Sequence, residues 1–330
     1  MTTTTYPAEI PRIDIHHRST TPVHVLGHAR SGTSMFVRLL RKYLHIAIGT
    51  ESQFVFRFQK LLPVYGDLNV EANRRHLVED ICRERWFERT HRRLGFTTTP
   101  DAILADVQEF TYPGILDATF RQLASYLEMP RWGDKTPEYL NHLPELYALF
   151  PDARYIHVAR DGRDVALSAF EQAFGEKNVH CAAVDWTEAM QKVQDFRESC
   201  PESQFLEVRY EDFLTDPVPV FRRLIDFLDI DDADGQLLQF IEQNIDSDLK
   251  RGNFEKWRSR LTPSELRRFD RIAHDHLVHY GYESSATGTV PPGPVSSAWW
   301  NLDNKARKLL RTDYWSDNLY KLRLRLAGRS

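Results

Sequence analysis

The sequence has few cysteines, no long apolar run and no excess of either charge. Its three cysteines (Cys82, Cys181 and Cys200) form no C-x-x-C pair, which excludes a disulfide framework and a zinc site of that kind. No stretch approaches the roughly 18 consecutive apolar residues of a membrane-spanning helix. The polar, Thr-rich segment 1–19 lacks the apolar core of a signal peptide. We therefore expect a soluble, cytoplasmic protein.

Neither sign of charge predominates. The 43 basic and 47 acidic residues leave a formal net charge of −4. We expect no nucleic-acid partner, because proteins that bind the phosphate backbone present a strongly basic surface. Apolar residues make up 42% of the chain and aromatic residues 12%. This composition suffices for a large buried core and excludes a mostly disordered or collagen-like chain.

Short apolar runs alternate with helical patterns along the chain. Each run ends in a glycine or a charged turn, and apolar residues then recur at helical spacing. The expected strands are 23–26, 154–159 and 205–209, and the expected helices are 33–44, 165–174, 216–228 and 262–281. This alternation predicts an α/β fold with three layers, α/β/α, around a central parallel sheet.

Composition also predicts the domain boundaries. We expect a flexible N-terminus (1–21), a main domain (22–285) with a largely helical insert (69–150), a Gly- and Pro-rich linker (286–298) and a C-terminal helical tail (299–330). The tail is basic and amphipathic. Soluble helices usually bury their apolar stripe against protein, so we expect it to dock on the domain or on another subunit. The alternative is contact with an anionic membrane surface.

The segment G-H-A-R-S-G-T-S, residues 27–34, lies between the first expected strand and the helix that follows it. In such a loop the backbone N–H groups and the helix N-terminus point toward a bound phosphate or sulfate. The lysine of a Walker A loop is absent, and Arg30 supplies the positive charge instead. The candidate ligand-binding residues of the loop are Arg30, Ser31, Gly32, Thr33 and Ser34.

Two segments resemble motifs of the sulfotransferases that use 3′-phosphoadenosine-5′-phosphosulfate (PAPS). The loop 27–34 resembles their 5′-phosphosulfate loop, G-x-P-R-S-G-T-[TS], with Ala29 in place of proline. The segment Y-I-H-V-A-R-D-G-R-D-V-A-L-S, residues 155–168, resembles their 3′-phosphate element, whose arginine and serine correspond to Arg160 and Ser168. The resemblance covers roughly residues 22–282. It is closer to the glycan- and tyrosylprotein-type members than to the cytosolic aryl sulfotransferases.

The resemblance implies a P-loop-like fold, PAPS as donor, 3′,5′-adenosine bisphosphate (PAP) as product, and no metal ion. It places Tyr210 near the adenine. It also places Arg251 and Gly252 near the 3′-phosphate, in a basic loop before Trp257 where Glu255 replaces the second glycine of the family pattern.

Sulfuryl transfer to a hydroxyl needs fixed cations near the leaving phosphate and a base for the hydroxyl proton. Lys135 lies in the segment W-G-D-K-T-P, which resembles a D-K-[ST]-P element whose lysine contacts the transferring group. The resemblance therefore assigns Arg30 and Lys135 as the catalytic cations and Glu51 as the catalytic base. His91 or His142 is the alternative base, because cytosolic members use a histidine.

The expected acceptor is a hydroxyl-bearing small molecule, carbohydrate or lipid. The insert contains five closely spaced arginines that could bind an anionic acceptor, although a charged helix face usually points to water: Arg83, Arg85, Arg89, Arg92 and Arg93. Two other functions stay open. One is a nucleotide-dependent kinase on a P-loop scaffold, which the missing loop lysine disfavours, and the other is a non-catalytic nucleotide-binding module.

Overall fold

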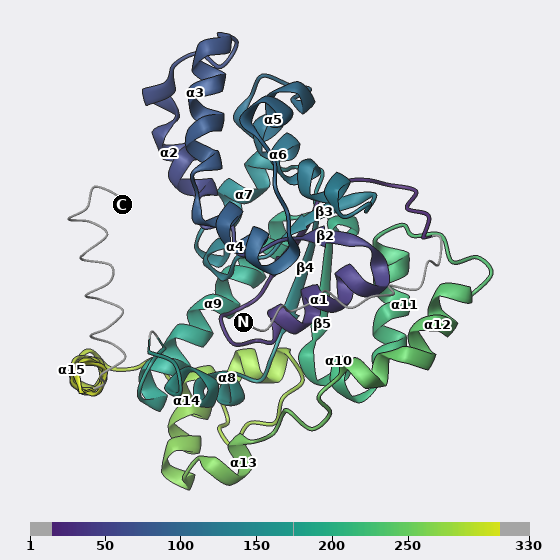
Figure 1. Cartoon of the computed structure of the whole chain (residues 1–330). Coiled ribbons are helices and arrows are strands. Elements are labelled where there is room, and N and C mark those ends of the chain that lie inside the picture. Colours follow the sequence, from purple (N-terminus) through teal and green to yellow (C-terminus); the bar gives the residue numbers. More distant parts are fainter. Residues whose placement is uncertain (1–14, 174, 311–330) are drawn as a thin grey trace, which may run out of the picture.

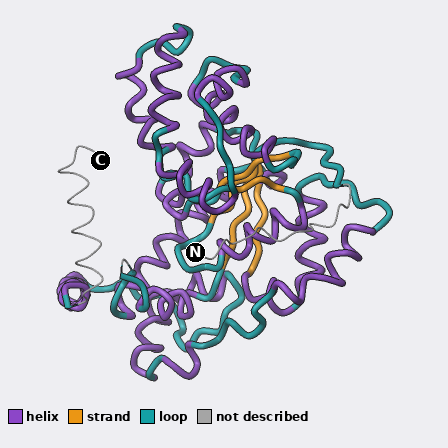
Figure 2. The backbone as a smooth tube through the Cα atoms, viewed as in Figure 1, coloured by secondary structure: helices purple, strands orange, loops and turns teal. Residues whose placement is uncertain are grey.

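Five parallel strands form the sheet at the centre of the molecule, in the order β2-β3-β1-β4-β5. The computed structural model describes residues 15–173 and 175–310. Figure 2 shows the strands side by side, with helices around them. The strands are β1 (Val23–Leu26), β2 (Ile46–Ile48), β3 (Arg131–Asp134), β4 (Arg154–Ala159) and β5 (Phe205–Arg209). The predicted α/β fold with a central parallel sheet is confirmed.

The sequence patterns predict three of these strands and miss β2 and β3. β2 has three residues and follows the preceding helix after His45 alone, which takes a left-handed conformation with φ 46°. β3 reads Arg-Trp-Gly-Asp, without a β-branched residue, yet all four residues are buried. A Cβ atom on Gly133 would lie 2.7 Å from the Val23 carbonyl oxygen, so glycine allows the close approach of β1. β3 lies inside the segment expected to be a largely helical insert, 69–150.

Helices cover both faces of the sheet (Figure 1). Because successive side chains of a strand point to opposite faces, Ile156 and Val158 of β4 pack in one apolar core and Tyr155 and Ala159 in the other. The helices are α1 (Thr33–Leu44), α2 (Val55–Tyr65), α3 (Glu71–Cys82), α4 (Arg85–Leu94), α5 (Pro100–Asp106), α6 (Tyr112–Tyr126), α7 (Leu143–Leu149), α8 (Gly162–Phe170), α9 (Val179–Ser199), α10 (Tyr210–Thr215), α11 (Pro217–Phe227), α12 (Gln236–Asn244), α13 (Trp257–Arg260), α14 (Pro263–His279) and α15 (Pro294–Leu309), with 3₁₀ helices at Pro137–Asn141, Glu202–Gln204 and Ile245–Asp248.

Capping side chains determine where two of these helices begin. Thr262 and Glu265 form the predicted capping box at the start of α14. α8 begins at Gly162, earlier than the expected 165, because the Asp161 side chain accepts a hydrogen bond from the Arg163 N–H and caps the first turn.

The strand register brings the loops after β1, β2, β3 and β4 to one edge of the sheet. His24 pairs with Asp134, and Leu26 pairs with His157. From β1 the chain first forms β2 and β3 on one side and then crosses to β4 on the other. In open α/β sheets, ligands bind at the carboxyl edge next to such a reversal of strand order. The topology therefore directs a ligand-binding site to this edge.

The described N-terminal residues pack on the domain. His17 forms an antiparallel bridge with Ile230, and its Nε2 lies 2.8 Å from the Leu44 carbonyl oxygen. The expected flexible segment 1–21 therefore has an ordered end, because residues 15–17 find backbone and apolar partners; residues 1–14 lie outside the described part.

The described part of the C-terminal tail also packs on the domain. α15 begins at Pro294, inside the expected linker 286–298. Its Asn304 is buried and accepts a hydrogen bond of 2.7 Å from the Lys177 N–H, just before α9. Residues 311–330 of the expected tail lie outside the described part. Over the described residues, no helix has both the length and the apolar character needed to span a membrane.

Candidate active site

The loop after β1 has the backbone conformation of an anion-binding loop. Arg30 and Gly32 both lie in the left-handed region, with φ 76° and φ 83°. Backbone turns of this kind direct successive N–H groups into one concavity. The Ser31 hydroxyl is buried and has no hydrogen-bond partner within the described ranges, although buried polar atoms are normally paired. The loop therefore fits a ligand that accepts hydrogen bonds.

Gly32 is required by a close contact as well as by its φ angle. A Cβ atom there would lie 2.5 Å from Cδ2 of Tyr210 and would also overlap the adjacent ring carbon Cε2. Tyr210 is the first residue of α10 and is buried. The absence of a side chain at position 32 thus allows the tyrosine ring to pack directly on the loop.

The structure brings Arg30, Arg160 and Ser168 together from three separate segments. The Arg30 Nε donates to the Ser168 hydroxyl at 2.9 Å, and Arg160 Nη1 donates to the Arg30 carbonyl at 2.8 Å. The Arg160 guanidinium also lies over the Tyr210 ring, 4.5 Å from its centroid. Two guanidinium groups, a hydroxyl and the loop N–H groups thus converge, a set suited to a ligand with more than one phosphate-type group.

These residues line a cavity of about 640 Å³. The loop after the last 3₁₀ helix closes one side of it, where the Arg160 Nη2 donates to the Asn253 carbonyl at 3.0 Å and the Asn253 amide donates to the Tyr210 hydroxyl at 2.8 Å. Lys250 and Lys256 of the same loop also line the cavity. Six cationic side chains and three carboxylates line the cavity, which therefore carries a net positive charge.

The positions of Arg251 and Gly252 differ from the prediction. Neither lines the cavity. The Arg251 guanidinium donates to the carbonyls of Leu214 and Thr215 at the end of α10 and pairs with Asp246. The backbone turn at Gly252, with φ 73°, separates the outward-pointing arginine from Asn253, which faces the cavity.

Glu51 and Lys135 form an ion pair at the same edge of the sheet. The Lys135 Nζ lies 2.5 Å from Glu51 Oε1. The lysine side chain is 8% exposed and the glutamate 35%, so the carboxylate stays accessible while the ammonium group is held inside. This arrangement presents a proton acceptor and a fixed cation side by side.

A buried hydrogen-bond network connects the segments that carry these two residues. The Asp134 carboxylate, next to Lys135, accepts hydrogen bonds from the hydroxyls of Ser52 and Tyr139. The Ser52 N–H, next to Glu51, donates to the Thr136 hydroxyl at 2.9 Å. Burial raises the pKa of Asp134 to about 6, against the opposing effect of its hydrogen bonds. The network therefore fixes the loop after β2 relative to the loop after β3.

Neither alternative base lies next to Lys135. His91 Nδ1 is 3.3 Å from the Phe96 carbonyl oxygen, and the His142 ring stacks on Phe56 with 4.5 Å between centroids. Neither lines a cavity at the sheet edge. Of the three predicted bases, Glu51 is the one that the structure places there.

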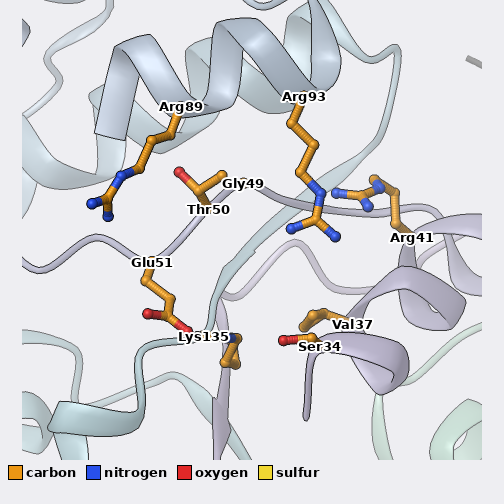
Figure 3. Close-up of a pocket in the computed structure, with 9 residues that line it drawn as sticks. All are labelled: Ser34, Val37, Arg41, Gly49, Thr50, Glu51, Arg89, Arg93 and Lys135. Atoms are coloured by element: carbon orange, nitrogen blue, oxygen red, sulfur yellow. Dashed lines mark hydrogen bonds and ion pairs between the residues drawn. The ribbon is translucent and has the colours of Figure 1, made fainter. Parts of the chain in front are cut away.

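A second, smaller cavity of about 150 Å³ lies on the Glu51 side (Figure 3). Ser34, at the start of α1, lines both cavities. Figure 3 shows Arg93 of α4 extending toward α1, with its guanidinium group next to that of Arg41, whereas Arg89 extends away from both, on the side of Thr50 and Glu51. The complete lining consists of Ser34, Val37, Arg41, Gly49, Thr50, Glu51, Arg89, Arg93 and Lys135.

The sequence patterns miss several cavity residues. Arg38 and Arg41 belong to no motif, although they follow Ser34 at one-turn and two-turn spacing and therefore share its face of α1. Asn253 and Lys256 lie in the predicted basic loop, but helical or strand periodicity does not predict which residues of a loop face inward. Within the described residues, no group of three or more His, Cys, Asp or Glu side chains is arranged to hold a metal ion.

The fold and this edge define a class of protein: a P-loop-like α/β protein whose loop after the first strand has an anion-binding conformation. The model of the sulfotransferase family matches residues 22–234, and the chain therefore belongs to the sulfotransferase family. The predicted family, fold class and enzyme class are confirmed.

The chain is also similar to individual proteins. Protein-tyrosine sulfotransferase A of Caenorhabditis elegans is 25% identical over 307 residues, which cover 91% of this chain and 69% of the worm protein. An uncharacterized protein of Aquifex aeolicus is 23% identical over 261 residues, 73% of this chain and 31% of that protein. The sulfotransferase domain from the curacin biosynthetic pathway has the same fold, with a TM-score of 0.52, 18% identity and coverage of 81% of this chain and 99% of that domain.

Proposed function

We propose that the protein transfers the sulfuryl group of PAPS to a hydroxyl of a small-molecule, carbohydrate or lipid acceptor and releases PAP. The observation that carries this proposal is the convergence of Arg30, Arg160 and Ser168 on one cationic cavity that shares Ser34 with the cavity of Glu51 and Lys135. The donor and the acceptor hydroxyl would then meet at the start of α1.

The residues present fit PAPS. The loop 27–34 offers N–H groups and the unpaired Ser31 hydroxyl to a 5′-phosphosulfate. Arg160 and Ser168, which are both hydrogen-bonded to Arg30, offer a guanidinium group and a hydroxyl to a 3′-phosphate. Tyr210 contributes an aromatic wall between these positions. The chemistry that PAPS supplies is a sulfuryl group on a phosphate leaving group.

Glu51 and Lys135 have different roles at the acceptor: Glu51 is the base and Lys135 is a fixed cation. The acceptor oxygen forms a bond to sulfur as the bond between sulfur and the phosphate oxygen breaks, and its proton passes to the Glu51 carboxylate. Lys135, held beside Glu51, and Arg30 stabilise the negative charge that develops during transfer. A neutral hydroxyl is a poor nucleophile, and an accessible carboxylate next to a buried cation supplies both a base and a fixed charge for this reaction.

Calorimetric titration with PAP tests the donor site directly. We expect metal-independent binding of PAP and an affinity about 10- to 100-fold weaker in Arg160→Ala, because one hydrogen-bonded charge is lost. Arg258→Ala is the matched control, because this half-exposed arginine pairs with Glu255 and Glu283 and does not line the cavity.

Three outcomes would contradict the proposal. If PAP does not bind while ATP with Mg²⁺ does, the donor assignment is wrong and the kinase alternative replaces it. If PAP binds and Arg160→Ala binds it as tightly as the wild-type protein, the nucleotide lies elsewhere on the molecule. A protein that binds PAP yet transfers no sulfuryl group to any hydroxyl would be the non-catalytic nucleotide-binding module.

A further inference from the structure

The arginines of α4 differ in what they contact. On the outer side of the helix Arg92 pairs with Glu88 at 3.2 Å, and in the preceding turn Arg83 pairs with Asp80 at 2.5 Å. Arg89 and Arg93, one helical turn apart, instead line the cavity of Glu51 and Lys135. In the part of the chain that the structure describes, neither has an acidic partner.

The position of α4 is fixed by contacts to the segment that leads into Glu51. The Trp86 indole N–H donates to the Thr50 carbonyl at 2.9 Å, and the hydroxyls of Thr50 and Thr90 lie 2.9 Å apart. A Cβ atom on Gly49 would lie 3.0 Å from the Trp86 ring, so the helix and the segment touch closely. These contacts fix the position of the helix, from which Arg89 and Arg93 line the cavity.

The cavity has far more positive than negative charge. Four cationic side chains line it (Arg41, Arg89, Arg93 and Lys135), and Glu51 is the one carboxylate among the lining residues. That carboxylate is engaged by Lys135 at 2.5 Å. Figure 3 shows the guanidinium groups of Arg41 and Arg93 directed toward the same space. Like charges that converge repel each other unless an anion lies between them.

We propose that the acceptor is a small molecule with an anionic group, a phosphate or a carboxylate, which Arg93 and Arg41 bind while the hydroxyl lies at Glu51. This inference rests on the proposed function and names the acceptor class for the same site. Guanidinium groups bind carboxylate and phosphate oxygens in a planar, two-pronged geometry. The cavity of about 150 Å³ has room for a compact anionic group.

Binding of simple anions to the PAP-saturated protein tests the inference. With PAP in the donor cavity, titration with phenyl phosphate reports on the remaining cationic cavity, and phenol is the matched neutral probe. We expect phenyl phosphate to bind and phenol to bind far more weakly. In Arg93→Gln the affinity for phenyl phosphate falls by about 10- to 100-fold, and Arg93→Lys retains part of it.

Arg92→Gln is the matched control, because Arg92 lies on the same helix and pairs with Glu88 away from the cavity. The inference is overturned if phenyl phosphate binds no better than phenol, or if it binds Arg93→Gln as tightly as the wild-type protein. In either case, PAP binding by the wild-type protein would leave the proposed donor site intact. Loss of PAP binding in the wild-type protein contradicts the proposed function instead. Preference for a tyrosine peptide with acidic neighbours over phenyl phosphate would also overturn the assignment of a small acceptor.

Discussion

Replacement of Gly32 by alanine tests the packing of the anion-binding loop on Tyr210. The new Cβ atom would lie 2.5 Å from Cδ2 of the tyrosine and overlap Cε2, at a residue with φ 83°. The left-handed conformation costs a non-glycine residue about 1–2 kcal/mol, and overpacking at a buried site costs about 1–3 kcal/mol. We therefore expect the free energy of unfolding to fall by about 2–5 kcal/mol.

The same substitution should weaken donor binding, because the Tyr210 ring has to move. Its hydroxyl accepts a hydrogen bond from Asn253, and its face supports the Arg160 guanidinium. Displacing the ring disturbs both contacts, and we expect PAP affinity to fall at least about tenfold, equivalent to ~1.4 kcal/mol.

Urea unfolding and calorimetric titration with PAP provide the two readouts for Gly32→Ala. Gly288→Ala is the matched control, because a Cβ atom there meets no atom within 4 Å. Wild-type stability and wild-type PAP affinity in Gly32→Ala would refute the argument that the loop and the tyrosine are packed as described. Lower stability with unchanged PAP affinity would refute only the connection from Tyr210 to the donor site.

Three further predictions concern catalysis and acid stability. Glu51→Gln should lower kcat by about 10²- to 10⁴-fold with unchanged PAP affinity, and a wild-type rate would exclude Glu51 as the base. Lys135→Met should lower kcat by about 10²- to 10³-fold. PAP affinity should stay nearly unchanged, because Lys135 does not line the cavity of Arg30, Arg160 and Ser168. A large effect on PAP binding alone would contradict the role of Lys135 as a catalytic cation. Burial lowers the pKa of His24 to about 3 from an ordinary 6.5, so below pH 6.5 the unfolded chain binds a proton that the folded protein excludes, and stability falls as the pH decreases. Between neutral pH and about pH 5 this loss of stability is ~2 kcal/mol. Urea unfolding at the two pH values should show that His24→Phe removes it. If the free energy of unfolding of His24→Phe still differs between the two pH values as it does in the wild-type protein, the assignment to His24 is wrong.

Sequence patterns predict those strands whose buried residues form a continuous apolar run in the sequence. β4 offers such a run, whereas β3 contributes Arg131, Trp132, Gly133 and Asp134 to the sheet. Arg131 is tolerated because its Nη1 donates to the Leu228 carbonyl at 2.8 Å, a partner distant in sequence. Periodicity carries no information about such tertiary contacts, which is why the sequence predicts a helical insert where β3 lies.

The residues of the candidate site also divide into those that the sequence predicts and those that it does not. Arg30, Arg160 and Ser168 follow strand ends at motif spacing, so their order in the sequence predicts their convergence. Arg251 and Lys256 are both basic residues of one loop, and the backbone turn at Gly252 decides that the first faces away and the second faces the cavity. The orientation of such loop residues depends on three-dimensional packing that spacing along the chain does not encode.

The crystal structure of the protein with PAP is the measurement that tests the central claim most directly. We expect the 5′-phosphate within hydrogen-bond distance of the loop N–H groups of residues 31–34, and the 3′-phosphate between Arg160 and Ser168. PAP bound anywhere else, such as the separate cavity between Arg197 and Arg223, would contradict the assignment of the donor site.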